Sequence, residues 1–336
     1  MKLIIQIPCF NEQASLPVTL AALPRSLPGI DTVEWLVIDD GSTDRTTDVA
    51  LSLGVDHVVR FERNRGLAAA FMAGIDACLR AGADIIVNTD ADNQYQADCI
   101  PTLIAPILNG EAQMVVGARP IGQIEHFSPL KKLLQRLGSW VVRVTSGTDI
   151  ADAPSGFRAI SREAALRLNV FNRYTYTLET IIQAGRRGIP TMSVPIRVNG
   201  DLRPSRLVKS IRTYVTRSMW VILRIFTIYQ PLQFFTLVGT VPFAAGFLLG
   251  VRWLVLFAQG TERAHVPSLI LAALLLLMGF MIWILGLVAY LISVNREMLE
   301  DIRTRVRRQE LVRPVAHTGE PGPREAAARR LSNRAA

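Results

Sequence analysis

A long run of apolar residues near the C-terminal end most limits what this chain can fold into. Residues Ser268–Val294 contain no charged side chain, and the preceding run, Leu232–Phe257, is interrupted only by Arg252. A helix of about 20 residues is long enough to cross the hydrocarbon core of a bilayer, so both runs can span it. Because the connector Ala258–Pro267 is short, we expect residues 231–295 to form a transmembrane hairpin of two helices.

Basic side chains flank this hairpin on both sides. Residues 206–230 mix arginine and lysine with large apolar residues, which is typical of amphipathic helices at a membrane interface. Arginines also recur after the second run, and from Arg313 the chain is rich in Pro, Gly, Ala and Arg. We expect residues 296–336 to be a basic, largely disordered tail. The positive-inside rule predicts a multi-pass protein of the cell membrane, with the N-terminal domain and the tail in the cytoplasm.

Charge divides the chain into two unlike parts. The formal net charge is +9, yet residues 1–110 hold 7 basic and 14 acidic side chains, against 30 and 14 in the remainder. An acidic N-terminal part suits a cation site and argues against nucleic acid as a partner, whereas a basic remainder suits anionic lipid or phosphate. The cysteines Cys9, Cys78 and Cys99 lack metal-ligand spacing, so we interpret them as reduced core residues.

The N-terminal part alternates short β-branched runs with helical patterns. Such alternation predicts an α/β fold with a doubly wound, parallel-type sheet, which binds ligands at the carboxyl ends of its strands. We expect residues 1–205 to form one cytosolic domain. The expected strands are Leu3–Ile7, Glu34–Ile38, His57–Phe61, Asp84–Asn88, Gln113–Gly117, Gly156–Ile160 and Thr191–Arg197. The expected helices are Ala14–Leu23, Asp44–Leu53, Gly66–Ala81, Ala97–Leu108, Ser128–Thr145 and Leu178–Arg187.

Two carboxylates follow the fourth of these strands. In an extended chain Asp90 and Asp92 point the same way, and convergent carboxylates repel each other unless a cation lies between them. Mg²⁺ or Mn²⁺ suits oxygen ligands and commonly completes its shell with water and substrate phosphates. The pair therefore predicts a metal–diphosphate site, although a polar turn after a strand would have the same residues. No glycine-rich dinucleotide motif or P-loop accompanies it, which disfavours dehydrogenases and P-loop enzymes.

Five polar clusters follow the expected strands, and together they resemble the family 2 glycosyltransferases with the GT-A fold. Their motifs are Pro8-Cys9-Phe10-Asn11-Glu12, Val37-Ile38-Asp39-Asp40-Gly41-Ser42, Asn64-Arg65-Gly66, Asp90-Ala91-Asp92-Asn93-Gln94 and Val116-Gly117-Ala118-Arg119. The resemblance covers roughly residues 1–295. Ser155-Gly156-Phe157-Arg158 and the C-terminal hairpin narrow it to the polyprenyl-phosphate glycosyltransferases, such as dolichol-phosphate mannose synthase and bacterial undecaprenyl-phosphate sugar transferases.

The resemblance implies a reaction and a set of roles. A sugar would pass with inversion from a nucleotide-sugar, UDP favoured over GDP, to a polyprenyl phosphate for cell-envelope glycan or glycoconjugate modification, with Mg²⁺ or Mn²⁺ as cofactor. Whether the protein forms a homo-oligomer is left open. The nucleotide-sugar would be bound by Pro8, Phe10, Asn11, Glu12, Asp39, Asp40, Asn64, Gly66, Asp90, Ala91 and Asp92, the metal by Asp90, Asp92 and Gln94, and the acceptor phosphate by Lys131, Lys132, Ser155, Arg158, Arg203 and Arg206; Asp90, Asp92 and Arg119 would be catalytic.

Two other functions fit parts of the sequence. A processive polysaccharide synthase of the same superfamily would usually carry Q-x-x-R-W, but Gln183-Ala184-Gly185-Arg186-Arg187 lacks the tryptophan. A membrane-anchored module that binds a nucleotide-sugar and regulates a neighbour would have no need of an intact D-x-D-x-Q. Phe10 stands where relatives often have tyrosine, and Arg203-Pro204-Ser205-Arg206 departs from the Gly-Ser-Lys of mannose synthases. The identity of the sugar is therefore open.

Overall fold

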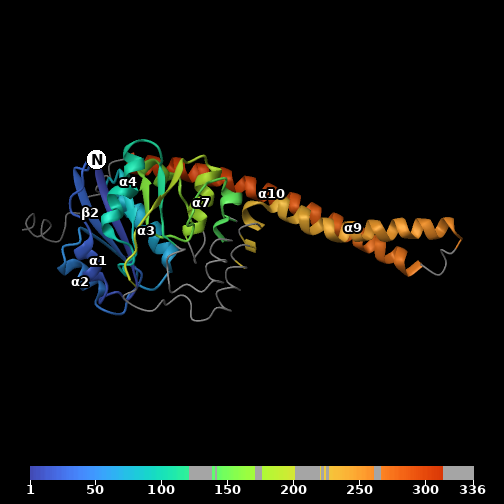
Figure 1. Ribbon diagram of the computed structural model, residues 1–336, viewed down its shortest axis with the longest axis horizontal. Helices are drawn as coiled ribbons and strands as arrows, with labels where there is room; N and C mark the ends of the chain where they lie inside the picture. Colours follow the sequence, from blue (N-terminus) through green and yellow to red (C-terminus); the bar gives the residue numbers. More distant parts are fainter. Residues whose placement is uncertain are drawn as a thin grey trace, which may run out of the picture.

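The computed structural model describes residues 1–120, 138–140, 142–170, 176–200, 220, 223–224, 227–260 and 266–312. An α/β domain forms one end of the molecule, and two long helices, α9 and α10, project from it side by side (Figure 1). The expected α/β fold with a membrane-length hairpin is confirmed.

A seven-stranded sheet forms the centre of the domain, with strand order β3-β2-β1-β4-β6-β5-β7. All described pairs are parallel except those of β6, which runs antiparallel to both β4 and β5. The sheet is therefore mixed, not wholly parallel. The strands are β1 (Lys2–Cys9), β2 (Thr32–Asp39), β3 (His57–Arg60), β4 (Ile85–Asn88), β5 (Met114–Ala118), β6 (Arg158–Ser161) and β7 (Thr191–Pro195).

The reversed strand β6 has a direct consequence for the rim of the sheet. Arg158, its first residue, pairs with Asn88 at the end of β4 and with Val116 near the end of β5. The chain thus enters β6 at the edge where its neighbours end. This brings Ser155, Gly156 and Phe157 to the same edge as the loops that follow the parallel strands.

Two layers of helices cover the sheet, because alternate strand residues face opposite sides. In β1, Leu3, Ile5 and Ile7 belong to the core beneath α1, α2 and α4, whereas Ile4 belongs to the core beneath α3, α6 and α7. The helices are α1 (Leu16–Ala22), α2 (Thr46–Ser52), α3 (Leu67–Arg80), α4 (Ile100–Leu108, after a 3₁₀ turn at Ala97–Cys99), α6 (Arg162–Arg167) and α7 (Thr177–Arg186).

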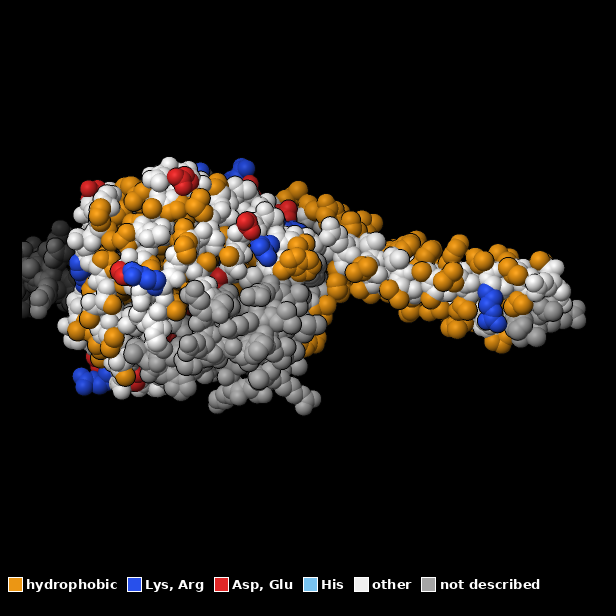
Figure 2. Space-filling model, viewed as in Figure 1, with side chains coloured by type: hydrophobic (Ala, Val, Ile, Leu, Met, Phe, Trp, Pro, Cys, Tyr) orange, Lys and Arg blue, Asp and Glu red, His pale blue; other side chains and the backbone are white. Residues whose placement is uncertain are grey.

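The hairpin consists of α9 (Pro231–Ala258) and α10 (Val266–Val312). Both are long and apolar enough to cross a membrane, and only 11% and 17% of their most apolar windows are buried, unlike the core helix of a soluble domain. Hydrophobic side chains cover this projecting part (Figure 2). Glycines allow the helices to touch: a Cβ on Gly239 would lie 2.6 Å from Trp283, and one on Gly279 would lie 2.7 Å from the Gly239 carbonyl.

Helix α10 corrects one expectation, since the tail is not disordered from residue 296 onward. The helix continues to Val312 and its last turns lie along the α/β domain (Figure 1). Arg307 binds Asp76 and donates to the carbonyls of Ala165 and Leu168, while Leu311 packs against the core. Residues 313–336 and most of the expected amphipathic segment 206–230 lie outside the described residues.

Candidate active site

The first two predicted clusters lie side by side because β1 and β2 are parallel neighbours, with Cys9 opposite Asp39. The Asn11 amide donates to Ser42 Oγ at 2.9 Å, and the Thr43 amide donates to Asn11 Oδ1 at 2.9 Å. These bonds join the loop after β1 to the loop after β2. The left-handed backbone of Asn11, at φ 55°, turns the chain at this junction.

The carboxylates of Asp39 and Asp40 are buried and organise the neighbouring loops. Asp39 accepts from the Ser42 amide at 2.8 Å and lies 3.5 Å from Arg60. Asp40 accepts from the amides of Arg65 and Gly66, at 2.7 and 2.9 Å. Burial raises the pKa of Asp40, and the two amides oppose that rise. Both acids therefore hold the loops at the ends of the strands, and their expected contact with a nucleotide stays a prediction.

Other predicted donor-binding residues divide into wall and surface. Pro8 and Glu12 are buried, and Ser15 donates to the Glu12 carboxylate. Phe10 is 40% exposed, and Asn64 is exposed as well. An exposed aromatic ring at this rim suits stacking on a planar base, whereas the buried Pro8 and Glu12 lie within the loop.

The D-x-D segment leaves β4 at the same rim. Thr19 Oγ1 donates to the Ala91 carbonyl at 2.9 Å, which fixes the segment to α1. The Gln94 amide donates to Asp92 Oδ1 at 3.2 Å. The Tyr95 hydroxyl hydrogen-bonds the Asp90 carboxylate and accepts from the Gly156 amide at 3.0 Å. Hydrogen bonds made by Thr19, the Gln94 amide and the Tyr95 hydroxyl therefore hold this short loop.

The electrostatics of Asp90 fit a cation-binding role. Burial and the nearby Asp92 raise its pKa to about 7, against the opposing influences of Arg119, the Tyr95 hydrogen bond and Arg158. The raised pKa means that ionising Asp90 beside Asp92 is unfavourable unless a cation compensates the two negative charges.

The residues fit a metal that takes part of its shell from substrate. Among the described residues no cluster of three or more His, Cys, Asp or Glu side chains has metal-binding geometry. Mg²⁺ commonly binds through one or two carboxylates plus substrate phosphates and water, and Asp90 with Asp92 supplies such a pair. Gly156 backs the site closely, since a Cβ there would lie 3.1 Å from both Asp90 carboxylate oxygens. Gln94 as a third ligand stays a prediction.

Arg119, at the end of β5, is paired with an acid that sequence reasoning missed. Its Nε and Nη2 donate to Asp152 Oδ2 and Oδ1 at 2.7 and 3.0 Å, and its amide donates to Oδ2 at 3.2 Å. Asp152 is 1% exposed and Arg119 13%. The pair fixes the guanidinium close enough to Asp90 to oppose the rise in the pKa of that acid. Its place just before Ser155-Gly156-Phe157-Arg158 is the signal that could have identified Asp152.

The expected role of Arg158 at the acceptor phosphate is not supported. The side chain is fully buried; Nε donates to the Ser155 carbonyl and Nη2 to the Ala153 carbonyl, both at 2.8 Å, and Nη1 donates to Thr180. Burial lowers the pKa of Arg158 to about 10. Arg158 therefore holds the 153–155 turn in place. Ser155 is buried too, and its hydroxyl has no hydrogen-bond partner among the described residues.

A buried polar wall stands behind residues 90–94, which we call the metal loop because Asp90 and Asp92 are its predicted metal ligands. The members of this wall were not among the predicted site residues. Asn88 Oδ1 accepts from Gln6 at 2.8 Å, and Asn88 Nδ2 donates to the Gly156 carbonyl at 2.8 Å and to the Tyr176 hydroxyl at 2.9 Å. The Tyr176 ring stacks on Phe71 with centroids 4.0 Å apart. An amide at the end of an apolar strand, as at Asn88, was the available signal.

The chain after β7 clamps the metal loop from its other side. The Asn199 amide donates to the Gln94 carbonyl and Asn199 Nδ2 donates to the Asn93 carbonyl, both at 2.8 Å. Asn93 has a left-handed backbone at φ 53°. Of the predicted acceptor residues, Lys131, Lys132, Arg203 and Arg206 lie outside the described residues, so their roles stay predictions.

Comparisons with known proteins agree with this geometry. The model of Glycosyl transferase family 2 matches residues 4–168. The undecaprenyl-phosphate mannosyltransferase of Micrococcus luteus is 30% identical over 218 residues, which cover 62% of this chain and 88% of that protein. A UDP-N-acetylglucosamine–dolichyl-phosphate N-acetylglucosaminyltransferase of Methanococcus voltae is 29% identical over 213 residues, which cover 57% and 83%.

A solved structure shares the fold. Glucosyl-3-phosphoglycerate synthase from Mycobacterium tuberculosis, in complex with Mn²⁺, UDP and glucosyl-3-phosphoglycerate, aligns with a TM-score of 0.52 at 23% identity, over 67% of this chain and 79% of that one. At this identity the likeness concerns the fold alone. Because the M. luteus relative matches at 30% identity over most of its own length and the family model covers the sheet and its rim, the chain belongs to glycosyl transferase family 2 and is a glycosyltransferase.

Proposed function

We propose that this enzyme transfers a sugar from a nucleotide-sugar to a polyprenyl phosphate at the cytoplasmic face of a membrane, with inversion at the anomeric carbon. One observation carries this proposal. Asp90, which packs against Gly156, lies at the same rim as the Arg119–Asp152 pair, and the chain of this domain continues into two membrane-length helices. The rim suits a soluble anionic donor, and the hairpin suits a lipid acceptor.

The described residues suggest how the leaving group is stabilised. Asp90 and Asp92 would hold Mg²⁺ or Mn²⁺, which, when bound, supplies positive charge to the diphosphate. Arg119, held by Asp152, presents a fixed cation toward the same group. Because these positive charges would be in place before the sugar–phosphate bond breaks, they would stabilise the negative charge that develops on the leaving diphosphate without rearrangement of the site.

The acceptor needs positioning more than it needs a base. A phosphate monoester has a second pKa of about 6, so a lipid phosphate is largely ionised near neutral pH. The one histidine in the described residues, His57, pairs with Glu34 at the opposite end of β3 from the rim. We propose that Lys131, Lys132, Arg203 and Arg206 bind the lipid phosphate, with Ser155 beside them.

The relatives support the acceptor more than the sugar. The names of the two proteins above share a polyprenyl phosphate, whereas one names mannose and the other UDP-N-acetylglucosamine. We propose UDP as the nucleotide, because the residues argue for a diphosphate and nothing in them favours guanosine. Glucose, mannose and N-acetylglucosamine are the sugars to compare.

Membranes containing the protein, incubated with labelled nucleotide-sugars and undecaprenyl phosphate, test this proposal. We expect one donor to give an organic-extractable product that requires Mg²⁺ or Mn²⁺ and is lost with EDTA and in Asp92→Ala. The matched control is Asp98→Ala, because Asp98 lies in the 3₁₀ turn that follows the metal loop and pairs with Arg197 at the surface. A product that forms without metal, a polymer, or no product with any donor would each contradict the proposal.

A separate comparison tests the acceptor residues. We expect Arg206→Ala to raise the KM for undecaprenyl phosphate while the KM for the donor stays unchanged. Equal losses on both substrates would remove Arg206 from the acceptor site.

A further inference from the structure

Both membrane helices meet the catalytic domain at the first turn of α7. Tyr229, just before α9, donates its hydroxyl to Glu179 Oε1 at 3.2 Å. Arg296 on α10 lies 3.7 Å from the same Glu179 oxygen and donates to the Tyr229 hydroxyl at 3.4 Å. Glu179 and Tyr229 are each 8% exposed. We call these three residues the α7 node.

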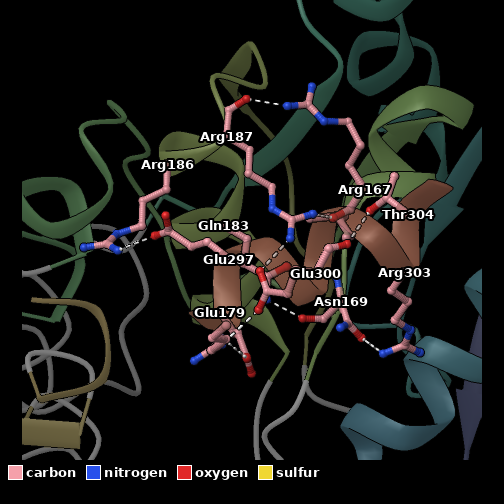
Figure 3. A network of polar contacts seen from close by, with 12 residues as sticks. Arg167, Asn169, Glu179, Gln183, Arg186, Arg187, Glu297, Glu300, Arg303 and Thr304 are labelled. Carbon is pink, nitrogen blue, oxygen red and sulfur yellow. Dashed lines mark hydrogen bonds and ion pairs between the residues drawn. The ribbon is translucent and has the colours of Figure 1, made fainter. Parts of the chain in front are cut away.

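The node belongs to a wider polar contact between α7 and α10. Arg296 Nε also donates to Glu300 at 2.8 Å, and Glu300 binds Arg187 at the other end of α7. Figure 3 shows Arg186 and Arg187 reaching toward Glu297 and Glu300 across this contact. Buried charges that pair across two elements favour one docked arrangement, because displacement would leave each charge without a partner.

The same helical turn also forms the back wall of the active site. Tyr176, which caps α7, binds Asn88 through its hydroxyl, and that hydroxyl packs so closely that a Cβ on Gly156 would lie 2.9 Å from it. Thr180, one turn later, accepts from Arg158. Tyr176 and Thr180 thus contact residues at the ends of β4 and β6, whereas Glu179 in the same turn contacts the hairpin through Tyr229 and Arg296.

One turn of helix thus joins the membrane hairpin to the wall against which Asp90 lies. We infer that the α7 node positions the metal loop: the hairpin, through Glu179, fixes the turn that carries Tyr176, and this turn fixes Gly156 against Asp90. The hairpin is then part of the catalytic scaffold as well as an anchor. Glu179, Tyr229 and Arg296 are positioning residues, and their effect on catalysis rests on the proposed function.

Two measurements on full-length protein in nanodiscs test this inference. The first is Mn²⁺ binding in the presence of UDP, followed by electron paramagnetic resonance, and the second is the steady-state kinetics of sugar transfer. For Glu179→Gln and Tyr229→Phe we expect the dissociation constant of Mn²⁺ to rise about three- to tenfold, the loss of one hydrogen bond or ion pair. We expect kcat to fall while the KM for undecaprenyl phosphate and the insertion into membranes stay unchanged. Tyr229→Phe removes a single hydroxyl, so it tests the node even where Glu179→Gln impairs folding.

One exposed ion pair supplies two matched controls. Arg308→Gln and Glu163→Gln each break the pair between α10 and α6. This pair ties α10 to the domain away from the first turn of α7, and we expect both variants to leave Mn²⁺ binding unchanged. Tyr176→Phe should weaken binding as the node variants do, and combining it with Glu179→Gln should add little, because both changes act on one path.

The outcomes separate this inference from the proposed function. Three results would overturn the inference: unchanged Mn²⁺ binding in both node variants, equal losses in the controls, or an effect confined to the KM for the lipid. If lipid product still forms in these cases, the proposed function stands. If no donor gives a lipid product but Mn²⁺ binding responds to the node, the proposed acceptor fails and the positioning role stands. No Mn²⁺ binding by the unaltered protein would overturn both.

Discussion

Arg119 and Asp152 are joined by two parallel hydrogen bonds at the rim of the sheet, Nε to Oδ2 at 2.7 Å and Nη2 to Oδ1 at 3.0 Å. The pair connects the end of β5 to the loop before β6, two segments that meet only because β6 is reversed. It leaves the guanidinium fixed in direction and close to Asp90. Under the proposed function a diphosphate would lie against this guanidinium, so the direction in which Arg119 is held would matter for catalysis.

Asp152→Asn should therefore reduce catalysis while the protein stays folded. The amide keeps the shape of the side chain but loses one charge-assisted acceptor, a contribution of about 1.5–3 kcal/mol, so kcat/KM for the donor should fall about ten- to hundredfold. Steady-state kinetics with labelled donor measures this. Asp149→Asn is the matched control, because Asp149 lies on the same loop and is 97% exposed. Equal activity of both variants would show that Arg119 needs no orienting partner.

Gly156→Ala tests the close packing behind the metal loop. The added Cβ would lie 3.1 Å from both Asp90 carboxylate oxygens and 2.9 Å from the Tyr176 hydroxyl, so one of these groups must move. We expect weaker Mn²⁺ binding, with a shift of about 1–3 kcal/mol from overpacking. Titration calorimetry with Mn²⁺ and UDP measures it. Gly250→Ala in α9, where a Cβ meets open space, is the control and should bind normally. Unimpaired binding in Gly156→Ala would contradict the assigned contact.

The sequence predicts the sheet well because its strands are marked by local patterns. The apolar runs before Asp39 and Asp90 locate β2 and β4, and the polar residues that follow them correctly indicate a shared rim. The direction of β6 could not be predicted, since strand patterning is the same whichever way the chain runs. The extent of α10 was missed because an arginine-rich stretch has a similar composition in a docked helix and in a disordered tail.

The individual site residues were harder to predict than their neighbourhood. Arg158 was expected at the acceptor phosphate from the resemblance of its motif, yet three partners within the chain hold it in the interior, where arginines are seldom found. Asn88, Tyr95 and Tyr176 were not predicted as site residues because their contacts join segments far apart in sequence. Long-range polar pairing of this kind has no periodicity, so a single sequence cannot reveal it.

Asn199→Ala tests the clamp on the metal loop. The side chain supplies one hydrogen bond, from Nδ2 to the Asn93 carbonyl at 2.8 Å, worth about 0.5–1.5 kcal/mol. We expect the concentration of Mn²⁺ or Mg²⁺ that gives half-maximal activity to rise about two- to tenfold, with near-normal kcat at saturating metal. Asn109→Ala, which removes an exposed contact with Glu111, is the control. A loss of kcat that excess metal does not restore would assign Asn199 a different role.

The last turns of α10 should stabilise the α/β domain, and shortening the chain tests this. Ending the chain at Val312 keeps the contacts of Arg307 with Asp76 and of Leu311 with the core, whereas ending it at Thr304 removes both. A loss of about 2–4 kcal/mol would lower the midpoint of thermal unfolding by about 4–16 °C for a domain of this size.

Differential scanning fluorimetry in matched detergent compares these two truncations with the full chain. We expect the chain ending at Val312 to unfold with the full-length protein and the chain ending at Thr304 to unfold earlier. Arg307→Gln in the full chain should give part of the loss, because it breaks the ion pair with Asp76 and weakens the bonds to the Ala165 and Leu168 carbonyls. Identical unfolding of both truncations would mean that the docked turns are held by the domain without stabilising it.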